Sequence, residues 1–375
     1  MLFPVAMTTL VTGGAGFIGT HLTRRLLEQG ERVIVLDSLE SQVHDGGFPT
    51  LPSGAVFVHG DVGDAAVVDS ALADVDRIVH LAAAVGVGQS MYEMASYVRR
   101  NTLATAVLLE RLVARTPRPS KLVVASSMSI YGEGEYVCDE HGHIAPSLRR
   151  EEQLRAREWE VRCPDCGAEL RAAPTSERKP LLPASIYAIT KRDHEELCLV
   201  AGAAYDIPTV ALRFFNVYGP GQALSNPYTG VAAIFSARLL HGRSPLVFED
   251  GRQSRDFIHV SDIVEGILRA LESDAAVGHA INLGTGRATP VTGVANLLAE
   301  GLESSVEPEI TGRYRVGDIR HCYADVRTAE RLLGFRSNVA LEDGFADLVG
   351  WLADQEAVDR VEGATTELLQ RGLAR

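Results

Sequence analysis

A glycine-rich turn near the start of the chain constrains the fold more than any other feature. Residues 12–19 read Thr-Gly-Gly-Ala-Gly-Phe-Ile-Gly, so Gly13, Gly16 and Gly19 are spaced three residues apart. The turn follows an apolar run and opens a stretch with helical spacing. Glycine allows a tight turn, close approach of the backbone to a pyrophosphate, and close helix–strand packing. Free N–H groups at the helix start would bind phosphates, so we predict a dinucleotide-binding strand–turn–helix unit.

Short apolar runs alternate with amphipathic stretches in the first part of the chain. The runs are rich in Val, Ile and Leu, which is typical of strands buried on both faces of a parallel sheet. We predict strands at 9–12, 32–36, 55–59, 77–81, 121–126 and 209–214. We predict helices at 17–28, 65–73, 97–115, 186–203, 231–240, 260–271, 291–300 and 341–353. This βαβ repetition predicts an α/β fold with a doubly wound parallel sheet.

The composition limits the class of protein and its partners. The chain has 375 residues, of which 46% are hydrophobic and 23% charged, as expected for a globular protein of two lobes. A net charge of −13 argues against a nucleic-acid partner. No apolar run reaches the roughly 18 residues of a membrane helix. Residues 1–11 lack the basic region of a signal peptide, so we expect a cytoplasmic protein with no membrane partner.

Two aspartates follow predicted strands at the edge of the sheet where a dinucleotide would bind. Asp37 ends the second strand, 18 residues after Gly19. A carboxylate there accepts hydrogen bonds from the adenosine ribose and repels a 2′-phosphate, which favours NAD over NADP. Asp61 follows the third strand and faces the adenine in one interpretation; in the other, it is simply a turn residue.

A tyrosine and a lysine are spaced as a general acid/base pair. Tyr187 and Lys191 stand at i and i+4, on one face of a predicted helix. We expect the lysine cation to lower the pKa of the tyrosine from about 10 towards the working pH, which suits proton transfer. Ser126, Ser127 and Ser129 follow the fifth strand, at the sheet edge where ligands of such folds bind.

With these motifs the chain resembles the extended short-chain dehydrogenase/reductase family, and within it the nucleotide-sugar epimerases and dehydratases. The resemblance spans nearly the whole chain except 133–183. It implies a Rossmann domain of residues 1–132 and 184–216 that binds NAD tightly, and a smaller substrate domain formed mainly by 217–375. The matching motifs are Thr12–Gly19, Asp37, Asp61, His80-Leu-Ala-Ala83, Asn101, Ser127, Tyr187, Lys191, Arg213-Phe-Phe-Asn216-Val-Tyr-Gly-Pro220, Arg255-Asp-Phe-Ile-His-Val-Ser-Asp262 and Arg315-Val-Gly-Asp318.

The resemblance also assigns roles to residues around the cofactor. It implies that Ser127 bonds the reacting sugar oxygen and that Tyr187 takes its proton. Lys191 would hold the nicotinamide ribose and tune Tyr187. Members that dehydrate sugars carry an acid directly after the catalytic hydroxyl, where this chain has Met128 and Ser129, so we expect no dehydration. The implied cofactor contacts are Gly13, Gly16, Phe17, Ile18, Gly19, Asp37, Asp61, Val62, Leu81, Ala82, Ala83, Asn101, Tyr187 and Lys191.

A further set of residues would bind the nucleotide sugar. By the resemblance, Asn216 contacts the substrate, Arg255 and Arg315 bind its phosphates, and Asp318 binds its ribose. Arginine suits phosphate because its planar fork bonds two oxygens. Two further assignments remain open: Asn226 contacts the substrate or forms a turn, and Cys322 lines the sugar pocket or is an ordinary small core residue.

Residues 133–183 form a charged insert, with 19 of 51 residues charged. Within it, Cys163-Pro-Asp-Cys166-Gly and Cys138-Asp-Glu-His141-Gly have the spacing of two zinc half-sites. We predict a structural Cys3His zinc site in a zinc-ribbon-like fold, with His143 as the rival fourth ligand. The alternative is a pair of reduced cysteines in a flexible loop. Because the insert lies between the strand of Ser127 and the helix of Tyr187, we expect it over the sugar pocket, as a lid or as an oligomer contact.

The insert and the loop motifs look most like bacterial dTDP-L-rhamnose 4-epimerases. The expected activity is therefore NAD-dependent 4-epimerisation of a nucleoside-diphosphate sugar through a transient 4-keto sugar. The first alternative is a 4-ketoreductase or dehydrogenase with net redox. The second is a non-catalytic regulator that binds NAD. The resemblance also leads us to expect a homodimer.

Overall fold

Seven parallel strands form the central sheet of the larger lobe. The computed structural model describes residues 7–44, 50–356 and 358–375, so the residues 1–6 used in the signal-peptide argument lie outside the described residues. The strand order is β3-β2-β1-β4-β5-β9-β14, and every neighbouring pair is parallel. The strands are β1 (Thr8–Thr12), β2 (Arg32–Asp37), β3 (Val56–His59), β4 (Arg77–His80), β5 (Lys121–Ser127), β9 (Thr209–Phe214) and β14 (Ala280–Leu283).

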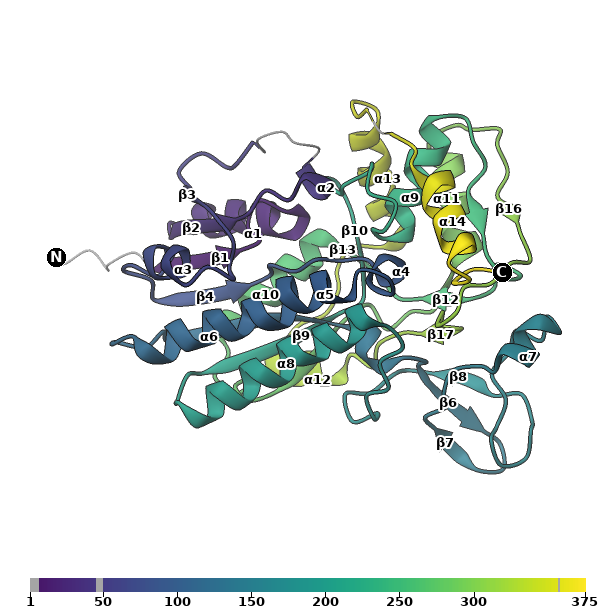
Figure 1. Cartoon of the computed structure of the whole chain (residues 1–375), viewed down its shortest axis with the longest axis horizontal. Helices are drawn as coiled ribbons and strands as arrows, with labels where there is room; N and C mark the ends of the chain where they lie inside the picture. The colour runs from purple at the N-terminus through teal and green to yellow at the C-terminus, as the bar shows by residue number, and fades with distance from the viewer. Residues whose placement is uncertain (1–6, 45–49, 357) are drawn as a thin grey trace.

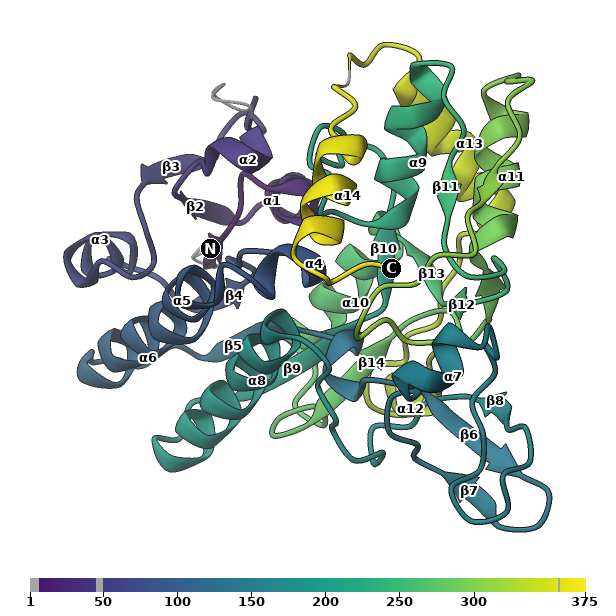
Figure 2. The same cartoon turned by 45° about the vertical axis from the view of Figure 1, so that its right-hand side comes forward.

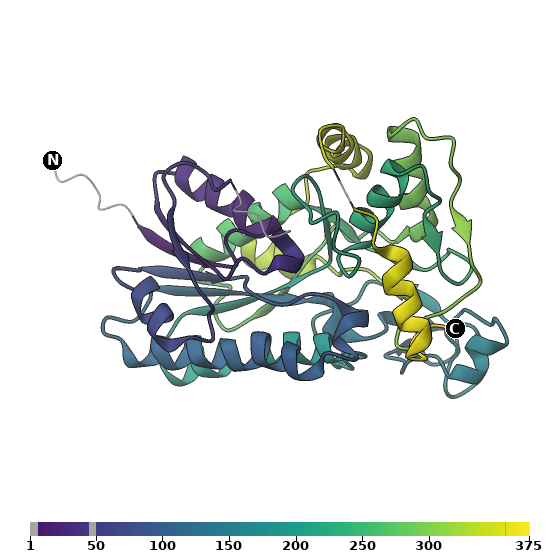
Figure 3. The same cartoon turned by 45° about the horizontal axis from the view of Figure 1, so that its top comes forward.

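Alternating side chains of these strands face two hydrophobic cores. In β2, Val33 and Val35 pack with one core, whereas Ile34 and Leu36 pack with the other. Helices α1 (Phe17–Glu28), α10 (Val260–Glu272) and α12 (Arg327–Leu333) cover the first face. Helices α3 (Ala65–Ala71), α6 (Ala104–Ala114) and α8 (Ile186–Ala204) cover the second. Figure 3 shows the helices on both sides of the sheet, which confirms the predicted doubly wound fold.

Several parts of the larger lobe differ from the sequence prediction; helix α12, for example, was not predicted. The helix predicted at 97–115 is composite: a π-helical turn, Val98–Leu103, precedes α6, and the short helices α4 (Val87–Ser90) and α5 (Met94–Tyr97) come before it. Strand β14 was not predicted, because its four residues carry little periodicity and, unlike the equally short β3 and β4, lie outside the βαβ repetition of the first part of the chain. It brings the chain back from the smaller lobe to the sheet edge beside β9.

The smaller lobe lies beyond the carboxyl ends of the strands (Figure 1). Helices α9 (Val231–Leu240), α11 (Val291–Gly301) and α13 (Leu341–Leu352) enclose a third core, and α14 (Val361–Gln370) lies near the C-terminal end. Short strands complete the lobe: β10 (Asn216–Tyr218) with β13 (Phe257–His259), β11 (Leu246–Val247) with β16 (Glu309–Ile310), and β12 (Ser254–Arg255) between β15 (Thr289–Pro290) and β17 (His321–Cys322). No helix among the described residues is long and apolar enough to cross a membrane.

The charged insert is a small unit of its own. Strands β7 (Gly142–Ile144), β6 (Glu135–Cys138) and β8 (Arg171–Ala173) form an antiparallel sheet in that order, beside the short helix α7 (Glu151–Arg155). Five buried residues form its core: Tyr136, Cys138, Val161, Cys163 and Leu170. Figure 1 shows the insert projecting from the body near β17, and Figures 1 and 2 both show β7 at its outer edge.

Candidate active site

The glycine-rich turn connects β1 to α1 in the geometry that the sequence predicts. Gly13 has φ +67°, and a Cβ there would lie 2.8 Å from the backbone of Ala82. A Cβ on Gly19 would lie 2.3 Å from the Gly13 carbonyl oxygen, so helix and turn pack too closely for any side chain. The cap residue of α1, Gly16, provides no side-chain hydrogen bond to the helix. The first N–H groups of α1 therefore remain available to a phosphate.

Asp37 lies at the end of β2, beside the glycine-rich turn. Its carboxylate accepts hydrogen bonds from the N–H groups of Ala15 (3.1 Å) and Leu39 (2.9 Å). Burial disfavours its charge, but hydrogen bonds from His44, Leu39 and Ala15 outweigh burial and lower the pKa of Asp37. A carboxylate held ionised here fits a cofactor ribose and disfavours a 2′-phosphate. Asp61 is exposed and accepts a 2.7 Å bond from the Gly63 N–H, as in the turn interpretation.

Asn101 ties the loop after β4 to the helix that carries the predicted catalytic residues. Its side-chain oxygen accepts a bond from the Ala84 N–H (2.7 Å), and its amide nitrogen donates to the Ala84 carbonyl (3.1 Å) and to Thr190 Oγ1 (2.9 Å). The side chain is fully buried. The predicted contact residues Leu81, Ala82 and Ala83 precede this anchored position, so Asn101 fixes the loop beside the glycine-rich turn.

Ser127 and Tyr187 come together at the carboxyl end of β5. The Ser127 hydroxyl accepts hydrogen bonds from Ser129 Oγ (2.9 Å) and from the Ser129 N–H (3.2 Å). Tyr187 lies in the first turn of α8, which Ser185 caps by accepting a 3.1 Å bond from the Ala188 N–H. Burial of the phenol raises the pKa of Tyr187, and a hydrogen bond with Ser127 opposes that shift.

The pKa of Tyr187 is therefore raised, contrary to the expectation that Lys191 lowers it. Lys191 Nζ instead lies 3.4 Å from His194 Nδ1, and burial lowers the pKa of Lys191 to about 8. His194 stacks on His80 with ring centroids 5.2 Å apart, and both rings are buried. Nothing in the sequence analysis singled out His194. Its position three residues after Lys191, on the same helical face, was the signal that could have found it.

Two of the predicted substrate-binding residues present groups that fit a polar, anionic ligand. The Asn216 side-chain oxygen is buried without a hydrogen-bond partner. The Arg255 guanidinium donates to the carbonyls of Ser254 (2.8 Å), Ile319 (2.7 Å) and Arg320 (3.0 Å). Within the described part of the chain, no carboxylate forms an ion pair with Arg255, so its charge remains available to a phosphate.

Arg315 and Asp318 bond to each other. Arg315 Nε lies 2.7 Å from Asp318 Oδ2, and its guanidinium lies over the ring of Phe248, 4.8 Å from the centroid. Asn226 is buried, and its side-chain oxygen accepts bonds from Tyr228 N–H (3.0 Å) and Gln42 Nε2 (3.1 Å). Asn226 therefore shapes its own turn and joins the two lobes.

Cys322 is buried beside the stem of the insert, which is the part around Gly134 and Thr175 that bonds to residues 321–325. Its Sγ lies 3.6 Å from the Thr175 hydroxyl, and burial raises the pKa of the thiol to about 12. A thiol held protonated in this way is no nucleophile. Backbone hydrogen bonds from Thr175 N–H to Tyr323 (2.7 Å) and from Asp325 N–H to Thr175 (3.0 Å) join the insert to this segment.

The four predicted metal ligands come together in the insert. The possible ligand atoms of Cys138, His141, Cys163 and Cys166 all lie within 4.8 Å of one another. His141 Nδ1 is 3.5 Å from the sulfurs of both Cys138 and Cys163, and the Cys138 and Cys166 sulfurs are 3.7 Å apart. Tetrahedral zinc with bonds of about 2.0–2.3 Å requires ligand separations of about 3.5–3.8 Å, so the residues fit the ion. The rival ligand His143 instead bonds Glu135 (2.8 Å).

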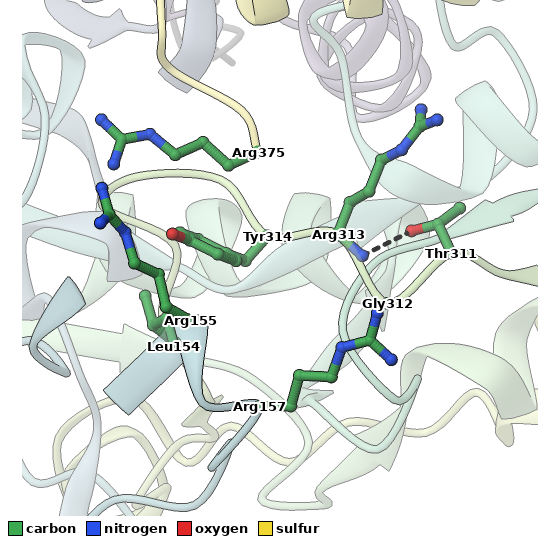
Figure 4. A pocket seen from close by; sticks show the side chains of 8 residues that line it. All are labelled: Leu154, Arg155, Arg157, Thr311, Gly312, Arg313, Tyr314 and Arg375. Atoms are coloured by element: carbon green, nitrogen blue, oxygen red, sulfur yellow. Dashed lines mark hydrogen bonds between the residues drawn. The ribbon is translucent and has the colours of Figure 1, made fainter. Parts of the chain in front are cut away.

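Arginines line a separate cavity of about 560 Å³ between α7 and the segment 311–314 (Figure 4). Glu151 already forms ion pairs with both Arg155 and Arg375. The Arg313 side chain points away from that of Arg155 (Figure 4). None of the residues predicted to bind cofactor or substrate lines this cavity, so we assign it no ligand.

Comparisons with known proteins agree with this geometry. The sequence model of the "NAD dependent epimerase/dehydratase family" matches residues 9–151 and 166–284. The chain is 32% identical to a dTDP-L-rhamnose 4-epimerase of Burkholderia thailandensis, over 92% of this chain and 95% of the relative. Its fold is similar to that of UDP-glucose 4-epimerase from Thermotoga maritima, solved with UDP-glucose (TM-score 0.76, 30% identity, 92% of this chain and 99% of the other).

A second solved structure contains both ligand types. It is UDP-glucuronic acid 4-epimerase from Bacillus cereus in complex with UDP-glucuronic acid and NAD (TM-score 0.74, 27% identity, 92% of this chain and 99% of the other). The family match covers more than half of the chain, and the identity extends over nearly all of it. The protein therefore belongs to the NAD dependent epimerase/dehydratase family.

Proposed function

We propose that the protein is an NAD-dependent 4-epimerase of a nucleoside-diphosphate sugar. The observation that carries this proposal is the meeting of Ser127 and Tyr187 at the carboxyl end of β5, with no acid directly after Ser127. The glycine-rich turn follows β1 at the same edge of the parallel sheet. The relatives named above support the same activity. Among the sugars of those relatives, dTDP-L-rhamnose is our first candidate, because the insert and the loop motifs resemble the dTDP-L-rhamnose 4-epimerases and one such enzyme is 32% identical to this chain.

The proposed domains divide the work between the two ligands. Residues 1–132 and 184–216 would hold NAD tightly, with the pyrophosphate at the start of α1 and a ribose at Asp37. Residues 217–375 would form most of the nucleotide-sugar site, where Arg255 offers an unpaired positive charge. Arg315 and Asp318 would exchange their mutual bond for bonds to the substrate. The side-chain oxygen of Asn216, which has no hydrogen-bond partner, would accept a hydrogen bond from the substrate.

In the proposed mechanism Ser127 and Tyr187 handle the proton of the sugar C4 hydroxyl. Ser127 hydrogen-bonds the C4 oxygen and aligns it with the phenol. Tyr187 removes the hydroxyl proton as general base and returns it as general acid. When bound, NAD⁺ would supply a reversible hydride acceptor for the sugar C4, and its positive charge would favour the Tyr187 phenolate. Reversal on the other face of the transient 4-keto sugar would invert C4 with no net redox, and Tyr187 would return the proton to the same oxygen.

One experiment distinguishes this activity from its alternatives. The purified protein is incubated with UDP-glucose, UDP-glucuronic acid and dTDP-L-rhamnose without added cofactor, and the sugar protons are followed by NMR. We expect C4 isomers to interconvert for at least one of these sugars. Net oxidation at C4 that requires added NAD⁺ or NADP⁺ and releases NADH or NADPH would instead identify a ketoreductase or dehydrogenase. Bound NAD with no turnover of any sugar would favour a non-catalytic regulator.

We also propose that Cys138, His141, Cys163 and Cys166 hold a structural zinc ion. Three thiolates and one imidazole form a closed donor set with no open position for chemistry. The charged insert has a core of only five buried residues, so metal binding would provide much of its stability. We expect about one zinc per chain in protein purified without chelator, and loss of that zinc in a Cys163→Ser/Cys166→Ser variant. Metal analysis that finds none would refute the site.

The resemblance further supports a cytoplasmic homodimer. Size-exclusion chromatography with light scattering would measure the mass of the particle in solution. A monomer at micromolar concentration would contradict this part of the proposal.

A further inference from the structure

Arg149 lies at the junction between the insert and the smaller lobe. Its side chain is only 1% exposed. Its guanidinium bonds both carboxylate oxygens of Glu249, from Nη1 at 2.9 Å and from Nη2 at 2.8 Å. Nη2 also donates to the Asp318 carbonyl (3.1 Å), and Nη1 to the Trp159 carbonyl (3.0 Å). A single insert side chain therefore bonds two separate segments of the smaller lobe.

These two segments carry the groups proposed to bind the nucleotide. Glu249 directly follows Phe248, whose ring lies beneath the Arg315 guanidinium. The Asp318 carboxylate forms an ion pair with Arg315. Arg149 thus fixes the backbone of Asp318 relative to the residue beside Phe248. Its planar fork bonds the carboxylate of Glu249 bidentately while it holds the Asp318 carbonyl, and the ammonium of a lysine lacks this fixed geometry.

Neighbouring buried charges make this arrangement rigid. Glu133 lies 3.6 Å from Arg149 Nε and accepts the Arg320 N–H at 2.9 Å. Arg320 Nη1 bonds Glu249 (3.0 Å) and Asp250 (2.6 Å). Burial raises the pKa of Glu133, whereas Arg149 and other donors oppose that shift. Breaking such a network exposes unpaired buried charges, so the guanidinium of Arg149 has one favoured position.

We propose that Arg149 is a positioning residue for the nucleoside-diphosphate end of the substrate. The inference rests on the proposed function and assigns the insert a different role from a sugar lid. The stem of the insert supports the nucleotide site through Arg149. Strand β6 begins at Glu135 and ends at Cys138, the proposed metal ligand. The Glu135 N–H donates to the Thr175 hydroxyl (3.1 Å), so β6 connects the stem to the proposed metal site.

The test is the Arg149→Met variant, which keeps an unbranched apolar stem and removes the guanidinium with its bonds. Calorimetry measures binding of UDP and dTDP, and steady-state kinetics measures KM and kcat for the accepted sugar. We expect nucleotide affinity to fall at least tenfold and KM to rise in parallel, with kcat within threefold of the native value. That pattern indicates lost binding that is common to ground and transition state. Arg149→Lys should give an intermediate loss.

A second variant protects the test against misfolding. Arg149→Met leaves Glu249 buried and unpaired, whereas Arg149→Met/Glu249→Gln removes both charges. The double variant should still bind nucleotide at least tenfold more weakly, because the Asp318 carbonyl has lost its donor. Arg155→Met is the matched control, since Arg155 belongs to the same insert but is exposed and paired with Glu151. The affinity of Arg155→Met for UDP and dTDP should equal that of the native protein.

The outcomes separate this inference from the proposed function. Native affinity and KM in a folded Arg149→Met or double variant would overturn the positioning role while leaving the proposed function intact. An equal fall of kcat and kcat/KM with unchanged nucleotide affinity would also overturn it. Native protein that binds neither UDP nor dTDP would overturn both.

Discussion

Two buried polar clusters in this molecule differ in whether their positive charges are paired with carboxylates. The cluster on α8 contains Lys191, His194 and His80, and within the described ranges no carboxylate forms an ion pair with Lys191. The cluster at the insert junction contains Arg149 and Arg320, each bonded to Glu249. Both clusters are almost fully removed from water.

The difference in pairing has consequences for protonation. Burial without a counter-charge lowers the pKa of Lys191 to about 8, so this lysine can change its charge near neutral pH. For Arg320, burial also disfavours the charge, but bonds to Asp250 and Glu160 outweigh it and raise the pKa. The first cluster suits proton handling, and the second suits fixed geometry. We therefore expect the largest effect on activity at Tyr187, one helical turn before Lys191 on α8, and the largest effect on stability in the second cluster.

The largest expected effect is on activity, in Tyr187→Phe. Removing the general acid/base should lower kcat by about 10³-fold or more, equivalent to about 4 kcal/mol of barrier. The urea midpoint and the NAD content should stay near those of the native protein. Tyr205→Phe is the matched control, because Tyr205 follows the same helix and is exposed. A variant with Phe at 187 that keeps full activity would refute the mechanism.

Arg320→Met should show the opposite pattern. Its side chain is fully buried and bonds Glu160, Glu249 and Asp250. Leaving these carboxylates unpaired should cost about 3–5 kcal/mol of the free energy of unfolding, measured by urea denaturation. The kcat of the folded fraction should change less than threefold. Arg336→Met removes an exposed ion pair and should leave stability nearly unchanged; equal losses in both variants would remove the distinction between the clusters.

Local patterns in the sequence predicted the residues of the α8 cluster better than those of the junction. The glycine-rich turn, the Tyr187–Lys191 spacing and the two half-sites of the metal cluster each lie within a few residues, so helical geometry or turn chemistry relates them directly. The bond of Arg149 to Glu249 spans 100 residues, and that of Arg320 to Glu160 spans 160. No periodicity reports such pairs, because they depend on how two lobes and an insert pack together.

Burial explains why the predicted direction of the Tyr187 pKa shift was wrong. The spacing correctly put Lys191 near Tyr187 along the helix, but the pKa direction depends on desolvation and on His194 beside the ammonium. The assignment of site residues to NAD and substrate stays a prediction, since it comes from the family resemblance. The fold class was predicted correctly because βαβ units impose the order of a parallel sheet.

The smallest expected effect concerns the pH dependence of stability, through His80. Burial and the Lys191 charge lower the pKa of His80 to about 3. His194, whose pKa is also lowered, is the other titratable group facing it. Above pH 6.5 the ring is neutral in both folded and unfolded chains. Below that, only the unfolded chain binds the proton, so stability falls as the pH falls.

From pH 7 to pH 5 this loss amounts to about 2 kcal/mol for a single buried histidine. The His80→Gln variant should start less stable at pH 7, because Thr12 and Thr105 lose their ring partner. Its further loss on acidification should then be about 2 kcal/mol smaller than that of the native protein, as measured by urea denaturation at both pH values. His279→Gln alters an exposed histidine and should leave the native difference unchanged. An identical acid-induced loss of stability in His80→Gln and native protein would mean that the α8 cluster does not keep the His80 ring neutral. The contrast between a cluster with unpaired charge and a cluster with paired charge would then be wrong.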